Sequence, residues 1–302
     1  MNSIYFDNAA TTQMRKEVVD RMTEVMRDVP GNPSSTHAFG RTAKSQIETA
    51  RKRVAELFNV SAGEIIFTSG GTEADNLVIN SAVRDLGVRR IITSRIEHHA
   101  VLHAAEEVAT CHKIDLQFVN LKECGTPDEK HLEELLKASD AKTLVSLMHV
   151  NNEIGNMIDI KAIATLCKSY GALVHSDMVQ SVGHYQVDLQ DISVDFIAAA
   201  AHKFHGPKGV GFAFVRKNSG LKPLIFGGSQ ERGLRAGTEA VHNIVGLEEA
   251  LILAYKNLEK ESAYVKGLKT YFAERLQKEI PEIKLNGNCS NLEKSTYTLL
   301  NV

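Results

Sequence analysis

Cysteine, long apolar runs and an excess of either charge are scarce or absent in this sequence of 302 residues. Its four cysteines form no CxxC pair and are too few for a disulfide framework, which predicts a reducing compartment. Lys plus Arg (35) nearly balance Asp plus Glu (37), so no basic surface for nucleic acid or an anionic membrane is indicated. No apolar segment approaches the roughly 20 residues of a membrane span, and MNSIYFDNAATT lacks the pattern of a signal peptide. We therefore expect a cytoplasmic protein that acts on small molecules.

A helix followed by an apolar strand recurs through the first 240 residues. The pairs after the first strand, EIIFTSGG, are TEADNLVINSAVRDLG with RRIITS, HLEELLKA with KTLVSLMHV, and IKAIATLCKSYG with ALVHSD, in which Gly171 is the expected helix stop. Near-continuous apolar strands that alternate with helices predict an α/β fold. Its central sheet should be mostly parallel and covered by helices on both faces.

The pattern changes after residue 240 to long helices, with one apolar stripe from Ile244 to Ala254 and another from Val265 to Leu276. Two strand candidates follow, at 282–287 and 295–302, and the second runs to the last residue. We therefore expect a large domain over 1–240, with about the first 15 residues packed with the smaller domain. The smaller α/β domain, 241–302, is expected to be incomplete.

Polar residues follow five consecutive predicted strands, where the carboxyl ends of a parallel sheet bind ligands. They are Gly71 with Thr72, then His98, Asn152, Asp177 and Lys203. The Gly-Gly-Thr turn precedes a helix, so its free N–H groups suit a phosphate. The same turn also suits a simple helix cap.

An Asp and a Lys on neighbouring buried strands are what a pyridoxal phosphate site requires, because the aldehyde needs an amine and the ring nitrogen needs a carboxylate. Burial and neighbouring cations (His202, His205 and Lys208) would lower the pKa of Lys203. Taken alone, Lys203 could be a surface residue and Asp177 a helix cap or part of a structural ion pair. His98, His99 and His103 have metal-ligand types, but no HExxH is formed, and we predict no metal site.

With these residues assembled, the chain resembles the NifS/IscS-type cysteine desulfurases of the class V aminotransferase group. The motifs that carry the resemblance are YFDNAATT, GNPSSTHAFG, FTSGGTEADN, EHHAV, MHVNNEIG, HSDMVQSVG, HKFHGPKGVGF and GGSQERGLRAGT, in the family's order. The resemblance implies a fold-type I transferase that depends on pyridoxal 5'-phosphate. It also implies L-cysteine as substrate, a homodimer and a sulfur-acceptor protein, with roles in iron–sulfur cluster assembly or tRNA thiolation.

The resemblance assigns roles to particular residues of this sequence. Lys203 would bind the cofactor covalently and act as the base, Asp177 would hold the pyridine nitrogen, and His98 would stack on the ring. The other cofactor-binding residues that it implies are Asn152 and Gln180 near the phenolic oxygen and substrate, Gly71, Thr72 and His202 near the phosphate, and Thr238, which would reach the phosphate of the neighbouring subunit.

The sequence departs from the family in three places. Ala200 stands where the family usually has a phosphate-binding Ser, which removes a contact worth about 1–2 kcal/mol, and Ala240 stands where many relatives have Asn. In the family, the strand that matches TLLNV is followed by a loop with the persulfide-forming Cys and by an Arg for the substrate carboxylate. The printed sequence stops before both, and none of its four cysteines has a nearby cation to favour a thiolate.

We therefore expect the cofactor half of a desulfurase without the sulfur-accepting half. Two alternatives stay open at this point. One is another class V activity, such as transamination or selenocysteine lysis. The other is a catalytically silent, cofactor-binding scaffold that pairs with a chain supplying the Cys.

Overall fold

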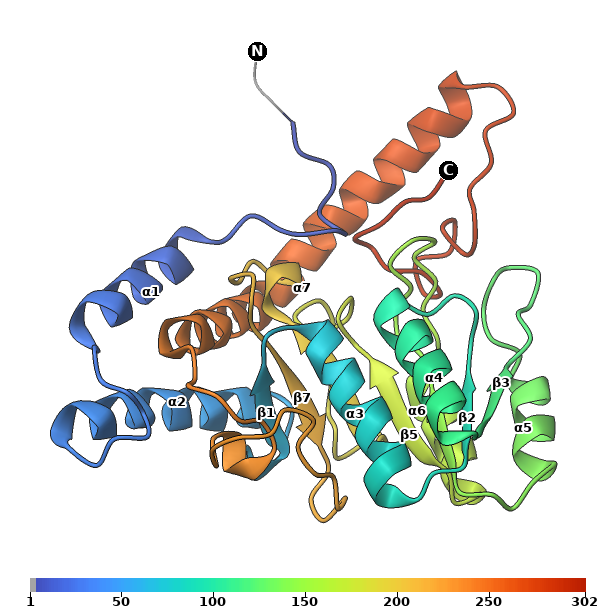
Figure 1. Cartoon of the computed structure of the whole chain (residues 1–302). Coiled ribbons are helices and arrows are strands. Elements are labelled where there is room, and N and C mark those ends of the chain that lie inside the picture. Colours follow the sequence, from blue (N-terminus) through green and yellow to red (C-terminus); the bar gives the residue numbers. More distant parts are fainter. Residues whose placement is uncertain (1–3) are drawn as a thin grey trace.

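A single sheet of seven strands forms the centre of the protein in the computed structural model, which describes residues 4–302 (Figure 1). The strands are β1 (Ile65–Thr68), β2 (Arg90–Thr93), β3 (Asp115–Phe118), β4 (Thr143–Ser146), β5 (Leu173–Asp177), β6 (Phe196–Ala200) and β7 (Gly211–Val215). Their order in space is β1-β7-β6-β5-β4-β2-β3. Strands β3, β2, β4, β5 and β6 pair in parallel, and β7 runs antiparallel between β6 and β1. The predicted mostly parallel sheet is confirmed.

Helices cover both faces of this sheet, because successive side chains along a strand point to opposite faces and in most strands are buried on both. They are α1 (Lys16–Asp28), α2 (Ala38–Leu57), α3 (Gly71–Leu86), α4 (His99–His112), α5 (Glu129–Lys137), α6 (Ile160–Ser169) and α7 (Val241–Glu279). In β1, Ile65 and Phe67 pack with α1, α2 and α7, whereas Ile66 packs with α3 and α4 on the other face. Every residue of β1, β2, β4, β6 and β7 is buried, which explains why these strands read as unbroken apolar runs.

The predicted helix–strand pairs form where the sequence places them. Helix α6 ends at Ser169, and Gly171 follows with φ +68°, a left-handed conformation that glycine adopts without steric cost. The chain can therefore turn at once into β5. This arrangement brings the carboxyl ends of β5 and β6 side by side, and Asp177 is the last residue of β5.

Residues 241–279 form one continuous helix, where the sequence suggested more than one. Its first apolar stripe is buried where α7 packs against α1 and α2: Ile244, Leu247 and Leu251 are at most 3 % exposed. The second stripe is not covered by the described residues, since Leu268 and Phe272 are about half exposed. Figure 1 shows this half of α7 projecting away from the sheet.

The two strands predicted at 282–287 and 295–302 are wrong. The described residues 280–302 form turns, and only Ser295 makes an isolated bridge, with Asn156. Their backbone groups bond to other partners: Lys269 of α7 donates to Thr296 O at 2.7 Å, and Thr296 N donates to Gly155 O at 2.7 Å. Without an adjacent strand to continue a ladder, apolar alternation alone does not form a strand.

Residues near the N-terminus lie across the carboxyl ends of the strands. Thr12 N donates to His202 O, and Arg15 forms a bidentate ion pair with Glu261 of α7. This segment therefore packs on both the sheet end and α7. None of the helices in residues 4–302 has the length and apolar character that crossing a membrane requires.

Candidate active site

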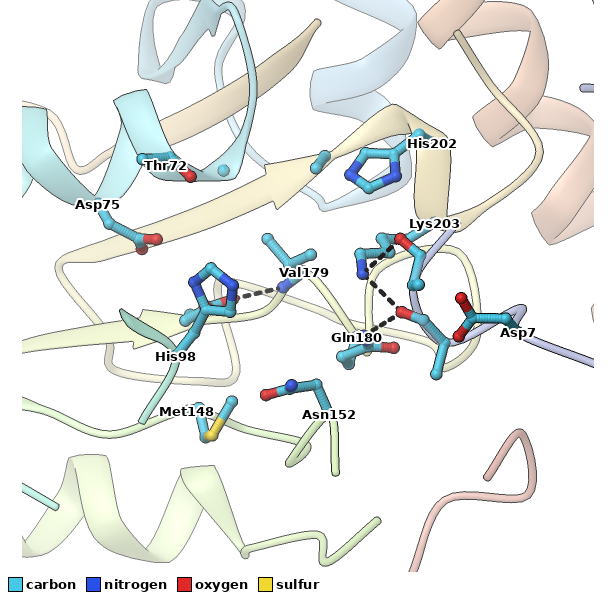
Figure 2. Close-up of a pocket in the computed structure, with 15 residues that line it drawn as sticks. Asp7, Thr72, Asp75, His98, Met148, Asn152, Val179, Gln180, His202 and Lys203 are labelled. Carbon is cyan, nitrogen blue, oxygen red and sulfur yellow. Dashed lines mark hydrogen bonds between the residues drawn. The ribbon is translucent and has the colours of Figure 1, made fainter. Parts of the chain in front are cut away.

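A cavity of about 550 Å³ lies at the carboxyl ends of β5 and β6, below the start of α3 (Figure 2). Eight of the nine residues predicted for the site line it together: Gly71, Thr72, His98, Asn152, Asp177, Gln180, His202 and Lys203. They come from segments far apart in the sequence. The parallel sheet therefore brings these strand-end residues into one place.

Lys203 lies in the short turn that follows β6, and its side chain points into the cavity (Figure 2). Its Nζ donates to two backbone carbonyls, Ala9 O at 2.5 Å and Ala10 O at 3.0 Å. Burial lowers the pKa of Lys203, and the carboxylates of Asp177 and Asp7 oppose this effect. Burial, and not the neighbouring cations expected from the sequence, therefore lowers the pKa of Lys203.

Asp177 is buried at the end of β5 and accepts a hydrogen bond from Val179 N at 2.9 Å. Burial raises its pKa to about 7, and the negative charge of Asp75 adds to the shift, while the Val179 N–H, His175 and His98 oppose it. A buried carboxyl with this pKa gains from a cationic partner, which would stabilise its ionised form. The side chain is therefore set to receive a protonated nitrogen.

The turn between β1 and α3 forms another wall of the cavity. Among residues 4–302, no side chain caps the first turn of α3, a helix of 16 residues that begins at Gly71. A Cβ on Gly71 would lie 2.6 Å from Val179 Cγ2, so this position has no room for a larger residue. Free N–H groups at a helix start attract an anion.

His202 lies beside this turn and contacts Thr11 Oγ1 at 3.2 Å. Burial, with the charges of Lys203 and Lys208, lowers the pKa of His202 to about 4. The ring is therefore neutral near pH 7 and can donate one hydrogen bond. Next to an anion it contributes a donor and no full charge.

His98 is the N-cap of α4, and its Nδ1 accepts from Ala100 N at 3.1 Å, which fixes the ring at the cavity wall. Gln180 donates from Nε2 to Ala9 O at 2.9 Å, and Asn152 lines the same cavity. His99 and His103 stack with centroids 5.0 Å apart. Within the described part of the chain, no group of three or more His, Cys, Asp or Glu has metal-binding geometry.

Thr238 is the predicted site residue that the fold does not bring to the cavity. It lines a separate hollow with residues 29–33 of the α1–α2 connection and residues 239–242. Sequence reasoning missed Asp7, Asp75 and Met148, which line the cavity. The sequence could have identified Asp75, because it lies one helical turn after Gly71 and therefore on the same face of the predicted helix.

The four cysteines all lie outside the residues that line the cavity. Cys111 is exposed, Cys167 is buried in α6, and burial raises the pKa of Cys167 to about 12. The Thr126 hydroxyl lowers the pKa of Cys124. Cys289 is buried, and its Sγ donates to Ile154 O at 3.3 Å.

Comparison with known proteins gives the same assignment along the whole described chain. The family model described as aminotransferase class V matches residues 4–302. The cysteine desulfurase IscS of Dictyoglomus turgidum is 41% identical over 293 residues, which are 95% of this chain and 73% of that protein. The IscS of Methanosarcina thermophila is 40% identical over 289 residues, or 95% of this chain and 70% of the relative.

Solved structures agree with the sequence comparison. A NifS-like protein superposes with a TM-score of 0.90 at 36% identity, covering 97% of this chain and 80% of the other. SspA in complex with cysteine superposes with a TM-score of 0.84 at 32% identity, covering 98% and 82%. The chain therefore belongs to the class V aminotransferases and, within them, to the pyridoxal phosphate-dependent cysteine desulfurases of the IscS/NifS type.

Proposed function

We propose that this chain binds pyridoxal 5'-phosphate in the cavity at the ends of β5 and β6 and uses it to remove sulfur from L-cysteine. One observation carries the proposal: Lys203 and Asp177, from neighbouring strands, line the same cavity. The available groups fit the cofactor, since an amine bonded only to carbonyls, a buried carboxyl and an uncapped helix start match its aldehyde, ring nitrogen and phosphate.

Each side chain has a distinct task in this proposal. Lys203 Nζ would hold the aldehyde of the cofactor and would take the proton from the substrate Cα, for which its lowered pKa is suited. Asp177 would hold the ring nitrogen protonated, and His98 would hold the ring from the side. When bound, pyridoxal phosphate supplies an electron-withdrawing ring that stabilises negative charge at Cα.

The remaining residues hold the two ends of the cofactor and the substrate. The Gly71 and Thr72 N–H groups, at the start of α3, and the neutral His202 ring bind the phosphate. Asn152 and Gln180 present amides to the phenolic oxygen and the substrate. The resemblance implies these assignments, and the presence of all five residues in the lining of one cavity supports them.

The overall conversion is L-cysteine plus a thiol giving L-alanine plus a persulfide. The Cβ–S bond breaks, the sulfur forms a bond to the acceptor sulfur, and a proton is delivered to the alanine Cβ. Because no cysteine of residues 4–302 lines the cavity, the acceptor thiol comes from outside these residues, in the same polypeptide or another. Sulfur delivery to iron–sulfur cluster assembly or tRNA thiolation, in the cytoplasm, belongs to this proposal.

A homodimer is also part of the proposal. Thr238 lies apart from the cavity of its own chain, at a surface hollow. This position is compatible with a contact to the phosphate of a neighbouring subunit. A second copy of the chain would then complete each site.

The test is a visible absorption spectrum of the protein reconstituted with pyridoxal phosphate, before and after L-cysteine, with dithiothreitol as the thiol. We expect absorbance of lysine-bound cofactor, followed by equal amounts of alanine and sulfide. Lys203→Ala should abolish both signals. Lys161→Ala, a surface lysine paired with Asp191, should leave both unchanged and serves as the matched control. A protein that stays colourless after reconstitution contradicts the proposal.

A further inference from the structure

Residues 227–238, here called the 227–238 segment, contain a backbone conformation that needs outside support. Glu231 and Arg232 have φ values of +45° and +59°, a region that residues with side chains rarely adopt, and Gly233 follows at +79°. Such conformations persist where surrounding contacts determine them, and they concentrate at functional sites. The conformation of this segment therefore depends on the contacts that Glu231 makes.

Glu231 is buried and covers the free edge of β1. It accepts two hydrogen bonds from Arg51 of α2, at 2.6 and 2.8 Å, and a third from Phe67 N at 2.8 Å. Arg51 in turn donates to Ile65 O at 2.8 Å. Strand β1 is at the edge of the sheet, so the ion pair supplies the partners that a further strand would otherwise supply.

A second ion pair joins the same segment to the turn after β1. Arg235 donates to both oxygens of Glu73, at 2.9 and 3.3 Å, and Glu73 also accepts from Ser69 N at 2.9 Å. Ser69 belongs to the turn that leads to Gly71. The 227–238 segment thus holds β1 by Glu231 and the following turn by Arg235.

We propose that Glu231 and Arg235 are positioning residues for the phosphate of the cofactor, an inference that rests on the proposed function. One ion pair bonds to β1 at Phe67 N, and the other bonds at Ser69 N to the turn that leads to Gly71 and Thr72, which line the cavity. Loosening either pair lets this turn move relative to Lys203, at the opposite end of the cofactor. Variants of either pair should therefore weaken binding of the phosphate group without weakening binding of the aldehyde.

The experiment measures the dissociation constants of pyridoxal 5'-phosphate and of pyridoxal, which lacks the phosphate, by absorbance titration of the apoprotein. Glu231→Gln keeps the size of the side chain and removes its charge. It should weaken binding of the phosphorylated compound about tenfold, with little change for pyridoxal. Arg235→Gln, at the more exposed pair, should shift the same ratio in the same direction.

Glu248→Gln is the matched control, because Glu248 is also buried and also pairs with an arginine of α2, Arg53, while no side-chain hydrogen bond within residues 4–302 joins it to β1. It should leave the ratio of the two constants unchanged. Equal weakening of both compounds in Glu231→Gln and Arg235→Gln, or no weakening, overturns the inference while leaving the proposed function intact. If the wild-type protein binds neither compound, the proposed function fails and the inference fails with it.

Discussion

Replacing Ala200 by serine should tighten the binding of pyridoxal phosphate, because it adds a hydroxyl at the phosphate end of the cavity. Ala200 ends β6 and lines the cavity, and its Cβ lies 3.8 Å from the position that a Cβ on Gly71 would occupy. The substitution adds one oxygen atom next to the turn that faces the phosphate. A hydrogen bond there is worth about 1–2 kcal/mol, which corresponds to a roughly 5- to 30-fold lower dissociation constant.

The assay is titration of the apoprotein with pyridoxal phosphate and with pyridoxal, followed by visible absorbance. The gain should appear only for the phosphorylated compound. Ala199→Ser is the matched control, since Ala199 is fully buried on the opposite face of the same strand. Its hydroxyl would lack a partner and should lower stability by about 1–3 kcal/mol without tightening binding. An Ala200→Ser protein that folds normally but binds no tighter refutes the reasoning.

Three further changes test other parts of the site. The protein should lose affinity for pyridoxal phosphate below about pH 7, because the carboxylate of Asp177 becomes protonated there. A titration of Asp177→Asn across pH 6–8 should show weak binding that does not depend on pH. Folding raises the pKa of Asp177 from 3.8 to about 7, so ionisation of its buried carboxyl lowers the stability of the apoprotein as the pH rises from about 4 to 7. Asp177→Asn should therefore raise the melting temperature of the apoprotein at pH 8. An unchanged melting temperature would contradict the energetic cost assigned to the buried charge. Thr238→Val should weaken cofactor binding severalfold and leave the solution mass at that of a dimer. A monomeric protein that binds the cofactor tightly would exclude a contact from Thr238 to the phosphate bound in a neighbouring subunit. Gly71→Ala should weaken binding of pyridoxal phosphate, since its Cβ would meet Val179 at 2.6 Å, and unchanged affinity would show that the turn is not tightly packed.

Much of the candidate site was predictable because its chemistry lies at strand ends. Apolar runs marked the strands, and the polar residue that ended each run marked a site position, so Asp177 and Lys203 could be paired before the fold was known. The two C-terminal strands were predicted wrongly for a related reason. Alternation marks a strand only where another strand provides hydrogen-bond partners, and residues 282–302 bond instead to α7 and to the loop around Gly155.

The sequence by itself determined the main helix–strand pairs of the first 240 residues, the mostly parallel sheet and the identity of the polar groups at its edge, because these depend on local periodicity and on residue type. Only the tertiary structure decided the surroundings of those groups. The carbonyls of Ala9 and Ala10 on Lys203, Asp75 beside Asp177, and the ion pair of Arg51 with Glu231 join residues that are far apart along the chain. Burial and long-range contact set pKa values and loop positions, and neither can be read from a local pattern.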